Sequence, residues 1–420
     1  MSYFDLNLDL TDEDRAIRQA AHRFASEFMR PIGKQMDRMT AEEAISPNSP
    51  FWVFLRRAYE LGYHKAPFPE IVGGLGFTPL QSHLLWEELF WGSPGLAAAL
   101  LLAAWPYVKV LATGNEALIG EFVIPFCQCT DAGVTGCWAI TEPDHGSDTL
   151  AVGEPFFSDP AIRMQCSARL EGDQWILNGQ KSAWVSCGPT ATHAMLNLQI
   201  DLSRGLSGGG VCMVPLDLPG VSRGKPLEKV GVRDLPQGEL FFENVKIPKR
   251  WMFVGPDEYG EWVAGNLGFG NTGVAVIALA LARAAFEEAL AYTRQRVQGG
   301  KPLIEHYSVK VRIHRMFAQV EALRAFSRAV WNLNMQIYPP LPEYALAAKT
   351  FCTETAREVV DEGLQLHGAN GLTKEYYIEK LWRDARSLTI ADGENLVLNR
   401  LGGDILKDTY PRASVNRIGL

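Results

Sequence analysis

The spacing of apolar and polar residues changes twice along the chain. In its first part, apolar residues recur every three or four positions, which is typical of amphipathic helices. Thr11 is placed to cap the first of these helices and Pro31 to end it. We therefore expect an N-terminal α-helical domain over residues 1–130. The helical segments are 11–31, 47–62 and 78–92, and the glycine-rich stretch 69–77 is expected to be a loop.

Between residues 131 and 247 the apolar segments become shorter and lose the helical period. Segments rich in β-branched and aromatic residues are separated by Gly, Pro, Asn and Asp, which indicates an antiparallel β domain resembling a barrel. The glycine-rich stretch 203–210 lacks a following helix and the Lys-Ser/Thr of a phosphate loop, so we expect a flexible hairpin. The expected strands lie within 136–140, 164–170, 174–179, 194–200, 209–216 and 238–248.

The helical period returns in the last part, over residues 248–420. Three long stretches, 273–296, 307–333 and 341–368, carry continuous apolar stripes. Long helices with short connections pack as an antiparallel bundle, and we expect this bundle to carry an oligomerisation surface. The predicted fold class is therefore α+β, with an N-terminal helical domain, a central antiparallel β domain and a C-terminal helix bundle.

Composition narrows the class of protein. Apolar residues make up 47% and charged residues 21% of the 420 residues, which is ordinary for a globular protein. The net charge of −8 argues against nucleic acid as a partner.

The apolar runs 95–105 and 273–282 are short of the ~18–20 residues that span a bilayer, and Pro106 is expected to close the first. The N-terminus is acidic and lacks the apolar run of a signal peptide, so we expect a cytoplasmic protein.

The cysteines give no sign of a metal site. Seven are present, and Cys127 and Cys129 form a CxC without a second pair at zinc spacing. We expect reduced, buried thiols and no bound metal.

The candidate chemistry lies where the three parts meet. In "CWAITEPDHGSDTL" (137–150) a strand runs into a turn that contains Gly146 and Ser147. Backbone N–H groups and hydroxyls at such a strand end suit a flat heteroaromatic ring and a phosphate. Near the other end, "TIADGENLVLNR" (389–400) places Asp392 and Glu394 around one glycine, either as a turn that opens a last helix or as the site of a catalytic base.

Six stretches in order resemble the acyl-CoA dehydrogenase family. The turn above is similar to its "TEPxxGSD", and "LNGQKSAWVSCG" (177–188) is similar to its "LNGxKxWITNG". The stretch 11–31 resembles its first helix and "PEIVGGLGF" (69–77) its "PEEYGGLG" loop. "RQRVQGGKPLIEHY" (294–307) and "QLHGANGLTKEYYIEKLWRDAR" (365–386) resemble two further motifs. Together the matches cover nearly the whole chain.

The resemblance implies a non-covalent FAD and a homotetramer built on the C-terminal bundle. Residues of the first motif would line the flavin ring and diphosphate, and residues of the second would flank the ring. The last two motifs would reach the FAD of a neighbouring subunit. The implied FAD-binding residues are Trp138, Ile140, Thr141, Gly146 and Ser147, then Trp184, Val185 and Ser186, then Arg296, Gln298, His306, Gln365, Gly368 and Ala369, with Gly393 and Glu394 beside the catalytic residue.

The resemblance also implies a catalytic residue. In the family a glutamate in "IYEGTNEIQR" removes the α-proton of an acyl thioester, and the residue at that place here is Asp392. The family's second base position falls at Gly270, beside Asn271, where no carboxylate stands. The implied reaction is FAD-dependent α,β-dehydrogenation of an acyl-CoA to the 2-enoyl-CoA. Asp392 would remove the proton, its backbone N–H would help to hold the thioester oxygen, and hydride would pass to flavin N5. The alternative is an Asp-Gly helix cap without catalytic duty.

Several positions depart from the family pattern. Trp184 lies one residue late, Tyr307 replaces a glutamine, and Gly238 stands where a substrate-binding arginine is common. His145 is expected to be a loop residue near the diphosphate. The shorter base suggests a branched or alicyclic acyl group, because a shift of ~1 Å at the reacting atoms can cost ~100-fold in rate.

Two rival functions stay open at the level of sequence. A flavin oxidase of the nitroalkane-oxidase type shares the fold and uses an aspartate, but its arginine seven residues later is Asn399 here, with Arg400 next to it. A non-catalytic binding member of the fold is the other rival. If the chain is a dehydrogenase, the resemblance implies an electron-transfer flavoprotein as electron acceptor.

Overall fold

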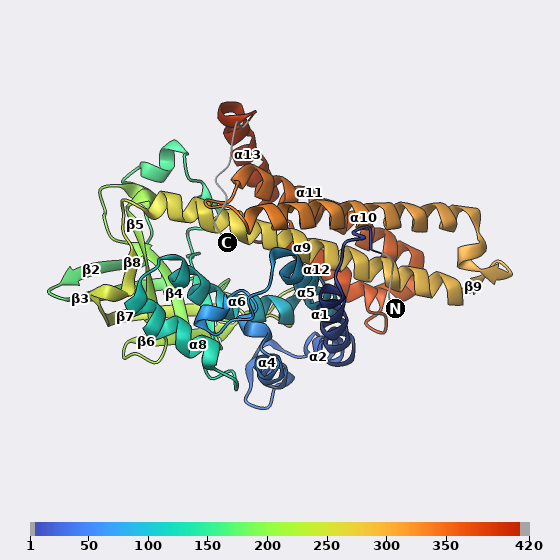
Figure 1. Ribbon diagram of the computed structural model, residues 1–420, viewed down its shortest axis with the longest axis horizontal. Coiled ribbons are helices and arrows are strands. Elements are labelled where there is room, and N and C mark those ends of the chain that lie inside the picture. The colour runs from blue at the N-terminus through green and yellow to red at the C-terminus, as the bar shows by residue number, and fades with distance from the viewer. Residues whose placement is uncertain (1–4, 412–420) are drawn as a thin grey trace.

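The computed structural model describes residues 5–411 (Figure 1). The outer ends of the first and third predicted domains, residues 1–4 and 412–420, lie outside this range. Figure 1 shows the sheet at one end of the long axis and α9 running from there toward the other end, where α10 and α11 lie alongside it. The N-terminal helices lie along one side of this assembly.

The N-terminal helices begin where the capping residues predict. The Thr11 hydroxyl accepts a hydrogen bond from the Asp14 N–H at 3.1 Å, and the Asp14 carboxylate accepts one from the Thr11 N–H at 2.9 Å. Thr78 and Gln81 form the same capping box before α5. The helices are α1 (Asp12–Phe24), α2 (Arg30–Met36), α3 (Ala41–Ile45), α4 (Pro50–Glu60), α5 (Pro79–Gly92), α6 (Pro94–Ala112), α7 (Glu116–Leu118) and α8 (Ile124–Gln128). The stretch 69–77 connects α4 and α5, as expected.

Two prolines expected to end helices do not end them. A π-helical turn, Ala25–Met29, comes directly before Pro31, and the helical path continues through it into α2. A widened turn can absorb the missing N–H and the bulk of a proline ring. Pro106 lies inside α6, where its ring packs against Gly136, and a Cβ on that glycine would lie 2.7 Å from the proline ring. Tertiary packing outweighs the lost hydrogen bond at Pro106, and the widened turn accommodates Pro31.

One helix within residues 5–411, α6, is long and apolar enough to cross a membrane by length and composition. Of its most apolar window, 61% is buried inside the protein. The helix packs against α5 and strand β1 and forms part of the core.

The central sheet is mixed rather than purely antiparallel. Its order is β6-β7-β3-β2-β4-β5-β8, and β1 pairs with β4 in parallel, with Trp138 opposite Met195. The predicted 203–210 hairpin joins β4 and β5. Two strands, β6 and β8, were not predicted. The strands are β1 (Gly136–Ala139), β2 (Ser167–Glu171), β3 (Gln174–Lys181), β4 (His193–Gln199), β5 (Gly209–Pro215), β6 (Val221–Pro226), β7 (Gly238–Pro248) and β8 (Met252–Val254).

The third part is dominated by long helices. α9 begins at Tyr259, fourteen residues before the predicted start at residue 273, and passes along the sheet before it joins the bundle. All seven cysteines are free thiols, six of them buried and Cys129 partly exposed. The helices are α9 (Tyr259–Gln295), α10 (Tyr307–Asn334), α11 (Pro342–His367), α12 (Ile378–Leu388) and α13 (Asn395–Thr409), and the short strands β9 (Val297–Gln298) and β10 (Lys301–Pro302) form a hairpin after α9.

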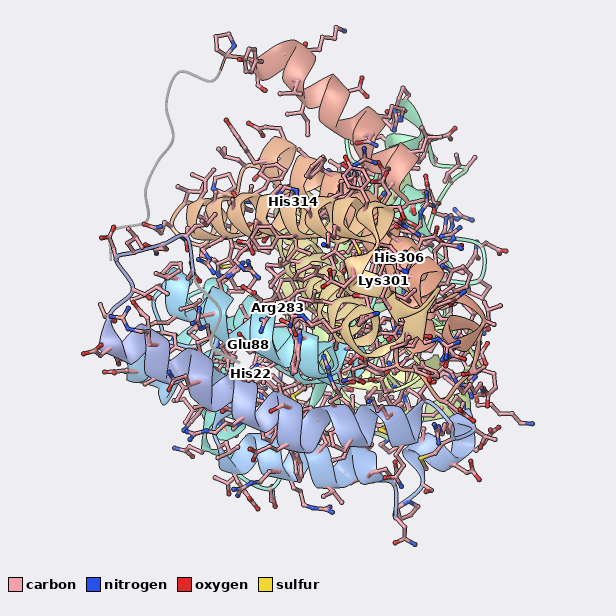
Figure 2. The ribbon with its side chains drawn as sticks, turned by 90° about the vertical axis from the view of Figure 1, so that its right-hand side faces the viewer. His22, Glu88, Arg283, Lys301, His306 and His314 are labelled. Carbon is pink, nitrogen blue, oxygen red and sulfur yellow. The ribbon has the colours of Figure 1, made fainter. Side chains whose placement is uncertain are left out.

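Buried charges join the N-terminal helices to the bundle. Arg283 of α9 contacts Glu88 of α5 at 2.9 Å, and Glu88 in turn is 2.8 Å from His22 of α1. Figure 2 shows these three side chains in one line from α1 to α9. The pairing compensates charges that would otherwise be costly to bury.

A second buried cluster joins all three parts of the chain. Asp234, in the loop before β7, accepts a hydrogen bond from Ser93 between α5 and α6 and lies 3.0 Å from the Lys380 ammonium of α12. Lys380 also contacts Asp384 at 2.6 Å, and the Asp384 carboxylate accepts a hydrogen bond from the Val232 N–H. Burial alone would lower the pKa of Lys380, but the two carboxylates outweigh it and hold the pKa above its usual range.

We expect Asp234→Asn to destabilise the fold strongly. The change leaves the Lys380 ammonium with one carboxylate in a fully buried place, and removing one partner of a buried pair typically costs about 3–5 kcal/mol. Urea unfolding at neutral pH measures the loss. The matched control is Glu305→Gln, because the Lys310–Glu305 pair is exposed and should contribute under about 1 kcal/mol. Equal effects of the two variants would contradict the prediction.

Candidate active site

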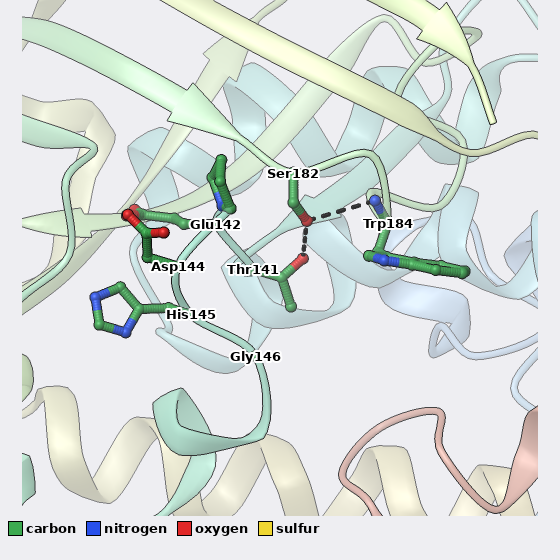
Figure 3. A pocket seen from close by; sticks show the side chains of 8 residues that line it. Thr141, Glu142, Asp144, His145, Gly146, Ser182 and Trp184 are labelled. Carbon is green, nitrogen blue, oxygen red and sulfur yellow. Dashed lines mark hydrogen bonds between the residues drawn. The ribbon is translucent and has the colours of Figure 1, made fainter.

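A pocket of about 310 Å³ opens where β1 runs out of the sheet. Its walls come from the loop after β1 and from the loop after β3 (Figure 3). The lining residues are Thr141, Glu142, Pro143, Asp144, His145, Gly146, Ser182 and Trp184. The two loops predicted from motifs as binding segments therefore meet in one pocket.

A fully buried ion pair holds these two loops together. The Lys181 ammonium, at the end of β3, is 2.8 Å from the Glu142 carboxylate and donates a hydrogen bond to the Ile140 carbonyl at 2.9 Å. Glu142 also accepts hydrogen bonds from the backbone N–H groups of Gln165 and Cys166. The site residues predicted from sequence did not include this pair, although both residues stand inside the two quoted motifs.

Hydroxyl groups line the floor of the pocket. Thr141 and Ser182 share a hydrogen bond of 2.8 Å between their hydroxyl oxygens, and the Ser182 N–H donates to the Thr141 carbonyl (Figure 3). Ser182 was missed by the sequence analysis. The Trp184 side chain is 60% exposed and stands at the rim, where an aromatic face is available to a bound ring.

The neighbouring predicted residues have mostly structural contacts. Val185 is buried, and the Ser186 hydroxyl accepts a hydrogen bond from the Gln237 amide. The Trp138 indole N–H donates to Asn197 at 2.9 Å, which fixes the half-buried ring on the sheet. None of these three residues lines the pocket.

The turn that follows Thr141 reaches the C-terminal part of the chain. The His145 ring hydrogen-bonds the Asp148 carboxylate at 2.6 Å and the Arg163 carbonyl at 3.0 Å, so it is held inside the loop. A Cβ on Gly146 would meet nothing within 4 Å, which leaves its backbone open to a ligand. The Ser147 hydroxyl accepts a hydrogen bond from the Glu394 N–H at 3.2 Å. This bond brings the predicted base-bearing segment to the pocket.

Asp392 lies in the turn between α12 and α13. Its backbone is left-handed, with φ of 52°, and its carbonyl accepts a hydrogen bond from the Asn271 amide of α9 at 3.3 Å. The residue is exposed to solvent, yet the protein atoms around the carboxyl group displace enough water to raise its pKa above the ordinary 3.8. The Lys349 ammonium offsets part of that rise.

The two residues after Asp392 shape the turn and start the next helix. Gly393 has φ of 102°, and a Cβ there would lie 2.6 Å from the Leu398 side chain, so a larger residue does not fit. The Glu394 carboxylate caps α13 by accepting from the N–H groups of Leu396 and Val397. Both sequence interpretations of this stretch are therefore compatible, because the turn opens a helix and also presents an aspartate.

Lys349 holds this turn through hydrogen bonds and was missed by the sequence analysis. It lies on α11, is fully buried, and donates hydrogen bonds to the Gly393 carbonyl at 2.6 Å and to the Asn395 side chain at 2.8 Å. Burial lowers the pKa of Lys349 to about 8, although the carboxylates of Asp392, Glu394 and Glu354 act in the opposite direction. A lysine inside an otherwise apolar helical stripe was the one sign of this contact in the sequence.

The remaining predicted residues lie at the far end of the bundle. They are exposed or half-exposed and come from the hairpin after α9 and from the end of α11. Figure 1 shows this hairpin at β9, remote from the sheet, and Figure 2 labels its residues Lys301 and His306. Tyr292 joins the two segments, because its ring stacks on His367 at 4.2 Å and its hydroxyl accepts from Asn370. The residues of this far-end group are Arg296, Gln298, His306, Gln365, Gly368 and Ala369.

The pocket residues fit a flavin and the far-end group does not reach it within one chain. The hydroxyl pair of Thr141 and Ser182, the open backbone at Gly146 and the exposed Trp184 ring suit a polar heteroaromatic ring and a phosphate. Among residues 5–411, no three His, Cys, Asp or Glu side chains are placed to hold a metal ion.

Comparisons with known proteins find similarity over nearly the whole chain. Models of the N-terminal, middle and C-terminal domains of acyl-CoA dehydrogenases match residues 11–129, 137–245 and 260–405. A 3-(aryl)acrylate reductase from Clostridium sporogenes is 30% identical over 400 residues, which cover 92% of this chain and 96% of that protein. Butyryl-CoA dehydrogenase from Megasphaera elsdenii is a structural neighbour with a TM-score of 0.83 and 27% identity, covering 96% of this chain and 100% of that one. A glutaryl-CoA dehydrogenase in complex with glutaryl-CoA has a TM-score of 0.86 and 25% identity, covering 99% and 100%.

We expect Lys349→Met to loosen the turn that carries Asp392. Two buried acceptors lose their donor, which typically costs about 1–3 kcal/mol each. The lysine pKa lies near 8 in the folded protein and at 10.5 when unperturbed. The unfolded chain therefore binds more protons between these values, and wild-type stability should rise relative to the variant as pH increases through that window.

Urea unfolding on both sides of this pH window measures the difference. Lys349→Arg is the control, because arginine keeps its charge and should remove the pH-dependent part. A stability difference that stays constant with pH would contradict the placement of Lys349 as a buried, titrating donor.

Proposed function

The chain belongs to the acyl-CoA dehydrogenase family, and we propose that it dehydrogenates an acyl-CoA thioester to the 2-enoyl-CoA with Asp392 as the base. The family is FAD-dependent, and FAD is the cofactor. The observation that carries the proposal is the hydrogen bond from the Glu394 N–H to the Ser147 hydroxyl. It connects the segment that presents Asp392 to the loop that lines the pocket.

The groups around Asp392 suit removal of a proton next to a thioester. The protein atoms around its carboxyl group displace water and raise its pKa, which makes it a stronger base when ionised. The backbone N–H groups of Asp392 and Gly393 donate no hydrogen bond to any residue between 5 and 411. We propose that the Asp392 N–H holds the thioester oxygen, where negative charge develops.

The pocket residues would orient the cofactor. When bound, FAD supplies the acceptor for the β-hydrogen, which leaves as hydride. We propose that Thr141 and Ser182 hydrogen-bond the edge of the ring and that Trp184 covers one of its faces. The backbone of Gly146 and the loop around Ser147 would lie near the diphosphate.

A hollow beside α9 would receive the acyl group. A Cβ on Gly270 or Gly273 would meet nothing within 4 Å, although Gly273 is buried. These glycines lie on one face of α9, next to Asn271, which contacts the Asp392 carbonyl. The absence of side chains at Gly270 and Gly273 would leave room beside α9 for the branched or alicyclic acyl group that the short base suggests.

A reductase is a second candidate because of the arylacrylate reductase from Clostridium sporogenes. Asp392 would then return the proton to a 3-arylacrylate or its thioester, and FAD, reduced by an external electron donor, would supply the hydride. The oxidase alternative gains no support from Arg400, whose guanidinium pairs with Glu154 and Asp404 on the surface.

We further propose a cytoplasmic homotetramer that passes electrons to an electron-transfer flavoprotein. The family resemblance supports these assignments. Large apolar side chains are exposed on the bundle, among them Phe317 of α10, Phe351 of α11 and Trp382 of α12, and such residues are typical of subunit interfaces. The far-end group would bind the FAD of a neighbouring subunit.

We expect Asp392→Asn to lower the rate of flavin reduction by about 10²–10⁴-fold, because a positioned base contributes that much. The measurement mixes the yellow holoenzyme anaerobically with saturated straight, branched and cyclic acyl-CoAs and follows bleaching of the flavin. Asp404→Asn removes an exposed carboxylate of α13 and serves as control. Rapid bleaching in Asp392→Asn would assign the base elsewhere. Bleaching by a nitroalkane but by no thioester would favour the oxidase, and reoxidation of reduced enzyme by a 3-arylacrylate alone would favour the reductase.

We expect Arg296→Ala combined with Gln365→Ala to weaken FAD retention while Asp392 and the pocket stay intact. Light scattering should give a tetrameric mass for the wild type, and the FAD content after gel filtration measures retention. Lys310→Ala, at an exposed position of α10, is the control. A monomeric wild type that retains FAD would contradict the shared site.

A further inference from the structure

Side chains of α6 lie against the stretch of α9 around Gly270, because Lys109 of α6 contacts the Phe269 ring of α9. On α6, Leu101, Trp105 and Val108 are partly exposed at helical spacing although the rest of that helix is largely buried. On α9, Phe269 and Gly270 are partly exposed in the same way. These residues form apolar walls that suit a hydrocarbon chain.

A lone ammonium group lies at the end of this apolar stripe. Lys109 is 8% exposed, and its nitrogen lies 4.3 Å from the centre of the Trp105 ring and 4.4 Å from that of Phe269. Between residues 5 and 411 it has no hydrogen bond and no ion pair. Burial lowers the pKa of Lys109 to about 7, and no charged group of the described chain offsets that effect.

Two further polar groups nearby also lack partners. Asn266 lies one turn before Phe269 and Gly270 on the same face of α9, is 1% exposed, and has neither its amide nitrogen nor its oxygen hydrogen-bonded within the described chain. The Trp105 indole nitrogen is buried without an acceptor there. A buried polar group without a partner is costly, so the presence of these groups on the contacting stretches of α6 and α9 needs an explanation.

The numbers of hydrogen-bond donors and acceptors in these groups indicate which ligand would complement them. An ammonium, an indole N–H and a carboxamide offer more donors than acceptors, and one of them is a cation. The complement is an anion with several lone pairs, enclosed by aromatic rings. A carboxylate meets that description.

We propose that Lys109, Asn266 and Trp105 form a subsite for a carboxylate at the far end of the acyl chain, so that the substrate is a dicarboxylic acyl-CoA. This inference rests on the proposed dehydrogenase function and adds the chemical class of the substrate. The polar groups lie about one and a half helical turns along α9 from Asn271, which corresponds to roughly 7 Å at the helical rise. A short dicarboxylic acyl chain can cover that distance from the reacting carbons at Asp392.

The test compares three thioesters on the holoenzyme: glutaryl-CoA, its terminal methyl ester, and hexanoyl-CoA. The ester keeps the shape and the carbonyl but lacks the charge, and hexanoyl-CoA lacks both. We expect wild-type kcat/KM to be highest for the dicarboxylic thioester. Lys109→Met should lower that value about 30-fold or more, as expected when one partner of a buried charge pair is removed, and should leave the methyl ester and hexanoyl-CoA nearly unchanged.

Lys109→Arg separates charge from packing, because it keeps the cation and should retain most of the preference. Equal kcat/KM for the three thioesters, or an equal loss for all three in Lys109→Met, would overturn the subsite. If no thioester bleaches the flavin, the dehydrogenase function itself fails. Calorimetric titration with the same thioesters would then decide the subsite, since preferential binding of the dicarboxylic thioester that depends on Lys109 supports it and equal binding refutes it.

Discussion

The buried contact of Lys380 with Asp234 and Asp384 is the constraint on which the arrangement of the three parts depends. Charges this deeply buried are tolerated only when each finds its partner. Asp234 comes from the β domain and Lys380 from the C-terminal part, while the Ser93 hydroxyl bonds the same carboxylate from the N-terminal part. A shift of any one part would leave a charge uncompensated. The pocket itself is lined by two loops of the β domain, and Ser147 in the first of them bonds the Glu394 N–H of the C-terminal part.

Two buried lysines hold separate segments of the site together. Lys181 connects the two pocket loops through Glu142, and Lys349 connects α11 to the turn at Gly393. Each ammonium satisfies acceptors from segments distant in sequence, which specifies one relative position. Lys109 is as deeply placed but has no such partner among the described residues, and this difference sets it apart from the structural lysines.

Local signals in the sequence were sufficient for most elements and for the motif residues. Capping by Thr11, the apolar periods and the alternating strands predicted most of the main helices and strands, and the motifs included Thr141, which lines the pocket. The prediction failed where tertiary contacts override local preference, as at Pro106, which packs against Gly136, and in the first turns of α9, where glycines mask the helical period. It also missed Lys349, because no local pattern shows which loop a residue of a distant helix will reach.

The proposed role of Asp392 as the base gives a reason for the contacts that hold the turn at residue 392. An aspartate has one rotatable bond fewer than a glutamate, so its carboxylate follows the backbone more closely and can adjust less. The backbone is anchored by Asn271 at the Asp392 carbonyl, by Lys349 at the next carbonyl and by Ser147 at the following N–H. Three successive residues are thus fixed from three different segments of the chain. This anchoring supplies the precision that the side chain itself cannot regain by rotation.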